Sequence, residues 1–189
     1  CGARLTVSYT RIGGLKNDVD QQWLDDLYKF TDTFPERILQ YETLIDKNRI
    51  WLKRTKGIGV ISAEEAINWG LTGPVLRGSG VPYDVRKVMP YGVYDKLKWE
   101  VPIGKNGDVY DRYRVRMEEL RQSNSIIRQC IEMIPQGPIM ADAPKFTLPA
   151  KDKVLSDMEH LIQHFVLITK GPQTAPEGEL YVATEVPKG

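Results

Sequence analysis

Three stretches of the chain carry apolar residues at every third or fourth position, which is the spacing of an amphipathic helix. The first stretch covers residues 19–45 and contains Pro35. A proline inside a helix removes a backbone donor and clashes with the preceding turn. The pattern therefore predicts one kinked helix, or two helices of which the second begins at Pro35. Its apolar positions are Trp23, Leu27, Phe30, Phe34, Ile38, Tyr41 and Ile45.

The other two stretches predict a long central helix and a last helix. The central one should span about 108–134 and end at Pro135, because proline stops a helix. Asn124 is a polar interruption in a seam that otherwise suits packing against another helix. The last helix should close at Gly171. The two stripes are Tyr113, Met117, Leu120, Asn124, Ile127, Ile131 and Ile134, and Val154, Met158, Leu161, Phe165 and Ile168.

Shorter signals complete the predicted secondary structure. Ser62 and Glu65 form a capping box, which predicts a short helix that runs to Trp69. Alternating apolar residues predict short strands at 5–9, 99–101 and 179–184. The fold class is therefore mainly α, with long helices packed side by side and minor β strands.

Composition excludes several classes of protein. The chain has 189 residues, a length that suits a single domain, with 41% hydrophobic and 27% charged residues. Its net charge of +1 gives no nucleic-acid footprint. The longest uninterrupted apolar run, at residues 165–168, is far shorter than the roughly 20 residues of a membrane span. Cys1 and Cys130 cannot form a disulfide framework, which favours a reducing compartment.

Both ends of the chain look unfinished. Cys1 could be the lipid-bearing residue of a lipoprotein, but residues 3–7 are not a polar tether. The strand predicted at 179–184 has no later strand to pair with. We therefore interpret residues 1–189 as one segment of a longer polypeptide. Such a segment would leave apolar surface uncovered, so we expect the isolated chain to self-associate or to be only marginally folded.

Two motifs resemble known sites without matching them. His160 and His164 have the spacing of a zinc protease helix, but Glu159 precedes the first histidine instead of following it. We predict no metal site. Residues 77–80 are glycine-rich but lack the Gly-Lys-Ser/Thr ending of a phosphate-binding loop, which favours a tight backbone turn.

Charged residues leave further possibilities open. Charges crowd the start of the central helix, where they form a solvated face with pairs such as Arg114 with Glu118, or a subunit contact. Asp18 follows the Gly13-Gly14 turn and precedes the first long helix. It is either a helix cap or a functional carboxylate on a loop. Spacing alone names no activity.

Four groups of residues stand in a characteristic order along the chain. They are Gly-Ala-Arg at 2–4 with Tyr-Thr-Arg-Ile-Gly-Gly at 9–14, Ser-Ala-Glu-Glu-Ala at 62–66 with Trp-Gly-Leu-Thr-Gly at 69–73, Leu-Arg-Gly-Ser-Gly at 76–80 with Tyr-Asp-Val-Arg-Lys at 83–87, and Gly-Asp-Val-Tyr-Asp-Arg-Tyr at 107–113 with Met-Glu-Glu-Leu-Arg-Gln-Ser at 117–123. Their order and spacing resemble the D subunit of the proton-pumping NADH–quinone oxidoreductase, respiratory complex I. The resemblance covers essentially the whole chain, which looks like the central part of that protein.

The resemblance implies a fold and a function. The fold would be a fragment of a larger one like that of hydrogenase large subunits. The protein would lie peripherally on the cytoplasmic side of a bacterial inner membrane. It would form the quinone pocket with the neighbouring subunit that holds the terminal iron–sulfur cluster. NAD and flavin would bind other subunits, quinone would be the substrate, and this chain would hold no cofactor. Quinone reduction would drive proton pumping in the membrane arm.

The resemblance also implies roles for three residues. Asp18 would pair with a quinone-site histidine that this chain does not contain. Such a pair favours the imidazolium, which suits proton donation to reduced quinone. Gly13 and Gly14 would shape the loop so that its backbone approaches the quinone pocket. No role is assigned to Arg77 or Asp84. We expect the isolated segment neither to oxidise NADH nor to reduce quinone.

Three alternatives remain open at this point. The family is related to nickel–iron hydrogenase large subunits, which hold their metal through paired C-x-x-C motifs, and Cys1 and Cys130 form no such pair. A non-catalytic helical assembly module would also fit the helical stripes. The third alternative is a related quinone reductase fed by ferredoxin or another donor, since other subunits select the electron donor.

Overall fold

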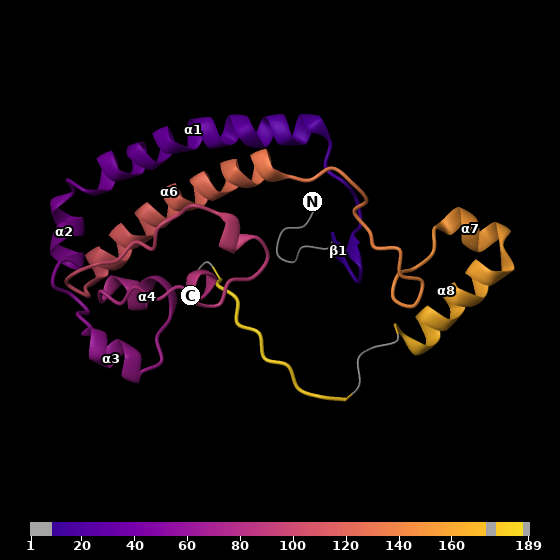
Figure 1. Cartoon of the computed structure of the whole chain (residues 1–189). Coiled ribbons are helices and arrows are strands. Elements are labelled where there is room, and N and C mark those ends of the chain that lie inside the picture. The colour runs from indigo at the N-terminus through magenta and orange to yellow at the C-terminus, as the bar shows by residue number, and fades with distance from the viewer. Residues whose placement is uncertain (1–8, 173–176, 187–189) are drawn as a thin grey trace. The chain divides into compact units, whose positions relative to one another are not determined.

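The computed structural model describes residues 9–172 and 177–186 (Figure 1). Helices dominate these residues and the sheet has only two strands, so the predicted mainly α fold is confirmed. The described residues form two compact units. The larger unit contains residues 22–134 and 181–186, and the smaller one contains residues 9–21, 135–172 and 177–180. None of the described helices is both long and apolar enough to span a membrane.

The larger unit is built on two long helices, α1 and α6, which lie side by side (Figure 1). Shorter helices cover one end of α6, where α2 and α4 pack on it and α3 packs on α4. The helix bounds are α1 Gln21–Ile45, α2 Arg49–Thr55, α3 Ala63–Asn68, α4 Gly73–Gly78, α5 Val85–Val88, the 3-10 helix η1 Tyr94–Lys96 and α6 Val109–Met133. The bounds of α6 lie within one residue of the predicted ones.

Helix α1 continues through Pro35, so the alternative of two separate helices is wrong. Pro35 has no N–H to donate to the carbonyl of Thr31, one turn earlier. Thr31 is fully buried, at 0% exposure, where an unpaired carbonyl is costly. Asn124 of α6 supplies the missing donor, because its Nδ2 lies 2.9 Å from the Thr31 oxygen. The polar interruption in the α6 stripe therefore compensates for the proline in α1.

Further polar contacts join α1 to α6 in antiparallel order. Arg114 Nη1 lies 3.2 Å from Asp46 Oδ2, and Glu118 pairs with Arg121, so the predicted pair of Arg114 with Glu118 is wrong. The crowded charges at the start of α6 thus serve contacts within the chain. The other contacts are Arg128 with Tyr28 and Asp32, Arg121 with Glu42, and Tyr113 with Asp46.

The buried face of α1 coincides only in part with the predicted apolar stripe, which includes Ile38. Trp23, Phe30 and Tyr41 are exposed, whereas Thr31 and Ile38 are buried. The reason lies in the seam, because Thr31 must face α6 to meet Asn124. One edge of the predicted stripe therefore remains on the surface of the described residues.

The capping box of α3 is confirmed. Ser62 Oγ accepts the Glu65 N–H at 3.2 Å, and Glu65 Oε2 accepts the Ser62 N–H at 3.0 Å. The Ser62 N–H and hydroxyl both donate to the Glu65 carboxylate, which lowers the pKa of Glu65. The helix ends at Asn68 with Trp69 as its C-cap, as the sequence predicts to within one residue.

The glycine-rich stretch at 77–80 is the end of a buried helix, α4, followed by a turn. A Cβ on Gly78 would lie 2.7 Å from Arg112 Cγ, and a Cβ on Gly104 would lie 2.3 Å from the Gly78 oxygen. Ser79 Oγ donates to the Ile61 carbonyl at 2.8 Å. The glycines therefore allow three segments to approach one another closely, in addition to the predicted turn at Gly80.

The smaller unit contains the two-stranded sheet and the last helices. The predicted single last helix is wrong, because the chain is extended at Asp157 and forms two helices. Asp157 caps the second of them by accepting the Glu159 N–H at 3.3 Å. The bounds are β1 Thr10–Arg11, β2 Gly14–Leu15, α7 Lys151–Ser156 and α8 Met158–Lys170.

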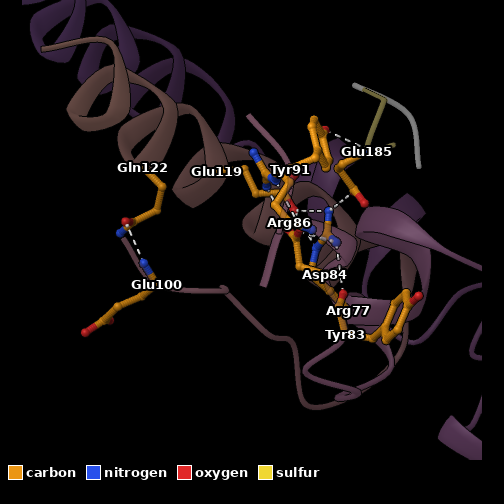
Figure 2. Close-up of polar contacts among 9 residues, drawn as sticks. All are labelled: Arg77, Tyr83, Asp84, Arg86, Tyr91, Glu100, Glu119, Gln122 and Glu185. Carbon is orange, nitrogen blue, oxygen red and sulfur yellow. Dashed lines mark hydrogen bonds and ion pairs between the residues drawn. The ribbon is translucent and has the colours of Figure 1, made fainter. Parts of the chain in front are cut away.

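The strands predicted at 99–101 and 179–184 are wrong, since both stretches are irregular. Around residues 99–101, side chains of α6 make the backbone hydrogen bonds that a partner strand would make. Gln122 Oε1 accepts the Glu100 N–H at 3.1 Å (Figure 2). Gln129 accepts from the N–H of Lys98 and donates to its carbonyl. The strand predicted at 5–9 lies almost wholly outside the described residues, and Tyr9 is not in a strand.

Candidate functional site

The predicted quinone loop is the turn of the β1–β2 hairpin. Thr10 pairs with Leu15 across the hairpin, and Gly13 has a φ of +92°. Backbone bonds tie the hairpin to a second segment of the smaller unit. Leu15 donates to the Ile139 carbonyl at 2.9 Å, and the Gly13 carbonyl accepts from the Ala141 N–H at 2.8 Å.

Both glycines are required by packing. A Cβ on Gly14 would lie 2.0 Å from the Ile139 oxygen, and a Cβ on Gly13 would lie 2.4 Å from Thr147 Cγ2. Cβ atoms essentially never make contacts below about 3 Å, so either substitution must displace backbone or side chains. The glycines thus let the hairpin lie directly against residues 139–147.

A cavity of about 410 Å³ lies beside this hairpin. Its lining is mostly apolar, and its two charged members, Arg11 and Lys16, come from the hairpin. Such a cavity can receive an apolar ring or chain whose polar end meets the cations. The lining residues are Arg11, Ile12, Lys16, Met140, Phe146, Leu148, Leu167, Ile168 and Pro172.

Asp18 is not among the residues that line this cavity. It is exposed, and its Oδ1 accepts the Val19 N–H at 2.8 Å, just before α1. Within this chain its observed contact is therefore a local one, to a residue that precedes α1, and it is not the cap of that helix. Its pairing with a quinone-site histidine stays a prediction.

The two histidines of α8 contact different residues. His160 Nδ1 contacts Asp157 Oδ2, which lowers the pKa of Asp157. His164 lines a different small cavity, with Leu148 and Leu155. No group of three or more His, Cys, Asp or Glu residues that could hold a metal occurs in the described ranges.

The larger unit contains a buried group of charged residues that was not predicted from the sequence. Arg77 of α4 is only 2% exposed and Asp84, the N-cap of α5, is 1% exposed. We call these two residues, with Arg86, Glu119 and Glu185, the Arg77 cluster (Figure 2). It joins α4, α5, α6 and the segment 181–186.

Arg77 uses all three of its guanidinium nitrogens. Nε donates to Glu119 Oε1 at 2.7 Å, Nη1 to the Tyr83 carbonyl at 3.1 Å, and Nη2 to Glu185 Oε1 at 2.9 Å. Asp84 Oδ2 lies 3.4 Å from Nη1. A planar guanidinium with a fixed fork of donors suits such a junction better than a lysine would.

Asp84 and Arg86 form a bidentate ion pair. Arg86 Nε and Nη2 lie 3.0 and 2.6 Å from the two carboxylate oxygens. The Arg86 guanidinium also stacks 4.4 Å above the Trp99 ring. Burial alone would lower the pKa of Arg86, but the hydrogen bonds and charge of Asp84 raise it above its usual range.

Arg77, Asp84 and Arg86 are near one another in the chain, but the two glutamates of the Arg77 cluster are far from them, so the sequence does not reveal all five as a group. Glu119 and Glu185 follow Arg77 by 42 and 108 residues. A weak signal is present, since Arg77 is a charged residue in an apolar, glycine-rich stretch. Nothing in its spacing identifies the carboxylates that it meets.

Comparison with known proteins identifies the family. The family model described as "Respiratory-chain NADH dehydrogenase, 49 Kd subunit" matches residues 1–189. The chain belongs to this family. The resemblance found in the four sequence motifs is therefore confirmed, and membership in the 49 Kd subunit family displaces the hydrogenase alternative.

Several bacterial relatives of this family are about half identical to the chain. The D subunit of the NADH-quinone oxidoreductase of Rickettsia bellii is 49% identical over 188 residues, and that of Geobacter metallireducens is also 49% identical over 188 residues. The corresponding D 2 subunit of Thermodesulfovibrio yellowstonii is 50% identical over 193 residues. In each case the match covers 100% of this chain and 48% of the relative. The chain thus spans about half the length of these members of the 49 Kd subunit family.

Proposed function

We propose that the full-length protein containing this chain helps to form the quinone-reduction site of a proton-translocating NADH–quinone oxidoreductase. The observation that carries the proposal is the match of all 189 residues to the 49 Kd subunit family, together with relatives named as the D subunit of that enzyme. In this proposal the electrons come from the terminal iron–sulfur cluster of a neighbouring subunit. NADH and flavin react on other subunits, and the segment alone is inactive.

The hairpin in the smaller unit supports a quinone-side role. A quinone has a polar ring and an apolar tail, and the cavity beside Gly13 and Gly14 combines an apolar lining with Arg11 and Lys16. We propose that this cavity contributes to the quinone site in the complete assembly. Asp18 then acts through a histidine elsewhere in the full-length protein, whose imidazolium it stabilises.

The proposed setting is a complex peripheral to the bacterial inner membrane, on its cytoplasmic side. The partners are the other subunits of the complex, above all the one that holds the terminal cluster, and the membrane arm is reached indirectly. No nucleic acid is involved. Quinone reduction at this site is coupled to proton translocation in the membrane arm.

Gly14→Ala in the intact complex tests the role of the hairpin. The added Cβ meets the Ile139 oxygen at 2.0 Å and displaces the hairpin. We expect NADH–quinone reductase activity to fall at least tenfold, while NADH oxidation by an artificial acceptor at the flavin is unchanged. Gly137→Ala is the matched control, because its φ of +146° resembles the +153° of Gly14 but no atom lies within 4 Å. Equal loss of both activities would refute a quinone-side role.

Asp18→Asn tests the proposed carboxylate in the same pair of assays. Loss of the negative charge should destabilise the partner imidazolium and lower the rate of quinone reduction. The histidine then loses its proton at a lower pH, so the pH optimum of that rate should move downward. Asp20→Asn, an exposed carboxylate two residues away, is the control. An unchanged rate and pH profile in Asp18→Asn would remove Asp18 from the mechanism.

The exposed apolar positions of α8 favour a second candidate, a non-catalytic assembly module. Met158, Phe165 and Ile168 are largely exposed. An assembly role predicts that Phe165→Ser lowers the amount of assembled complex. The activity per assembled complex would stay constant for both electron acceptors.

A further inference from the structure

The Arg77 cluster contains more buried carboxylates than guanidinium groups. Asp84 is matched by Arg86 through bonds of 3.0 and 2.6 Å. Arg77 is left to face both Glu119 and Glu185: Glu119 Oε1 lies 2.7 Å from both Nε and Nη2, and Glu185 Oε1 lies 2.9 Å from Nη2. One guanidinium charge cannot neutralise two carboxylates that converge on one of its nitrogens.

Burial makes this imbalance costly. The side chains of Glu119 and Glu185 are 18% and 10% exposed, and that of Arg77 is 2% exposed. Two carboxylates that share a site favour binding of a proton by one of them. Burial also raises the pKa of Glu119, an effect that the nearby Arg77 only partly opposes.

The remaining cations near the two carboxylates supply only part of the missing charge, because Arg116 and Arg86 lower the pKa of Glu119 less than Arg77 does, and burial outweighs them. Arg116 is exposed and donates to the Arg112 carbonyl, so solvent and salt screen its charge. The Tyr94 ring contacts the Arg86 guanidinium, which is already paired with Asp84. The other polar partners are neutral, namely the Tyr83 carbonyl on Arg77 and the Tyr91 hydroxyl, which accepts the Glu185 N–H at 3.1 Å.

A proton can reach this place. A cavity of about 460 Å³ borders the cluster, and a water molecule needs only about 30 Å³. Its lining includes both glutamates as well as Ser123 and Tyr94, so it is polar enough to hold water. Its other lining residues are Arg77, Arg86, Arg116, Leu120 and Val186.

We propose that Glu119, which meets Arg77 beside Glu185, is a proton-binding site, and that a proton on Glu119 holds residues 181–186 against the Arg77 cluster. With the proton bound, a single negative charge faces the Arg77 guanidinium and the two charges balance. When the proton leaves to water in the cavity, two anions face one cation. Glu185 lies on an irregular segment and Glu119 on a long helix, so the segment 181–186 is the part that moves away.

Hydrogen exchange of the full-length protein in the assembled complex tests this site. The amide of Glu185, which donates to Tyr91, and its neighbours report on the attachment of the segment. After correction for intrinsic exchange, we expect protection of residues 177–186 to fall as the pH rises from about 5 to about 8. The fall should be up to about tenfold for each unit by which attachment raises the pKa of Glu119.

Three variants make the test specific. Glu119→Gln makes the side chain at position 119 neutral at every pH. The segment should stay attached, and its protection from hydrogen exchange should no longer depend on pH. Glu185→Gln removes the other charge and should also abolish the pH dependence, which keeps the test valid if the first variant does not assemble. Glu118→Gln is the control, because this neighbour on α6 is 43% exposed and pairs with Arg121. It should behave as the wild type.

Two outcomes would overturn the proposal. The first is pH-independent protection of residues 177–186 in the wild type. The second is a Glu119→Gln or Glu185→Gln variant that retains the pH dependence of the wild type. Either result would mean that both glutamates remain ionised on Arg77.

Discussion

Replacing Asn124 by leucine should loosen the α1–α6 pair because it leaves the Thr31 carbonyl without a donor. Asn124 Nδ2 supplies a bond of 2.9 Å to that oxygen, and Pro35 cannot supply one. Leucine has the same branched arrangement of side-chain heavy atoms as asparagine, but its two methyl groups are larger than the amide oxygen and nitrogen, so the change removes the bond and adds bulk. It also removes Asn124 Oδ1, which has no hydrogen-bond partner among the described residues.

The expected cost follows from these contacts. An unsatisfied buried acceptor costs about 1–3 kcal/mol, and removal of the orphan amide oxygen offsets part of that. We therefore expect Asn124→Leu to lower the local stability of the α1–α6 pair by about 1–2 kcal/mol. That corresponds to an increase of roughly 5- to 30-fold in opening.

Pro35→Ala provides the decisive comparison. Alanine restores the N–H at position 35, which can then donate to the Thr31 carbonyl within the helix. Pro35 is exposed, so little packing is lost. In the Pro35→Ala background, Asn124→Leu should therefore cost about 1–2 kcal/mol less than in the wild type, and this difference is the coupling energy between the two changes.

Hydrogen exchange measures both changes in the assembled complex, where amide protection reports local opening. The relevant peptides cover residues 27–38 and 117–128. Asn124→Leu should reduce their protection more in the wild-type background than in the Pro35→Ala background. An equal loss of protection in the wild-type and Pro35→Ala backgrounds would refute the claim that Asn124 compensates for the proline.

Three further outcomes follow from the structure. Arg77→Gln should destabilise the larger unit by about 3–5 kcal/mol, because it strands buried carboxylates, and exchange protection of α4 and α6 should fall together. Ser62→Ala should cost about 1 kcal/mol through loss of the α3 cap, measured as faster exchange of the Glu65 amide. Burial raises the pKa of Tyr113 most, and the hydrogen bond to Asp46 adds to this effect, so that the pKa rises from 10.0 to about 12. The folded state therefore holds this proton more tightly, stability should fall as pH rises from about 10 toward about 12, and Tyr113→Phe should flatten that fall in an alkaline denaturation series.

The elements that the sequence predicts well are those with local, mutually consistent signals. Helix α6 has a regular apolar period that only Asn124 interrupts, an N-cap at Asp108 and a proline after its end. The capping box of α3 likewise involves only residues three positions apart. Local physics decides both helices, so no knowledge of the tertiary structure is needed.

The errors arise where distant residues decide the outcome. The face that α1 buries depends on Asn124, which lies 93 residues from Thr31. The strand predicted at 99–101 is replaced by bonds to glutamine side chains of α6. Helix α4 contains glycine and proline, which lower intrinsic helix propensity, and it forms because its neighbours pack closely around it.

The candidate site shows the same division. The Gly13-Gly14 turn is evident from the sequence, but the reason for each glycine is its contact with residues 139–147. The apolar period of α8 is also evident, yet Met158, Leu161, Phe165 and Ile168 are exposed in the structure. Periodicity identifies an apolar face, but it does not say what covers that face.

Labelling of the intact complex with a photoreactive quinone analogue tests the central claim most directly. After illumination and digestion, mass spectrometry locates the labelled residues. The account predicts label within this chain, on residues 11–16 or 139–148 beside the hairpin cavity, that an excess of unlabelled quinone prevents. Quinone-protected label confined to other subunits, with none on this chain, would contradict it.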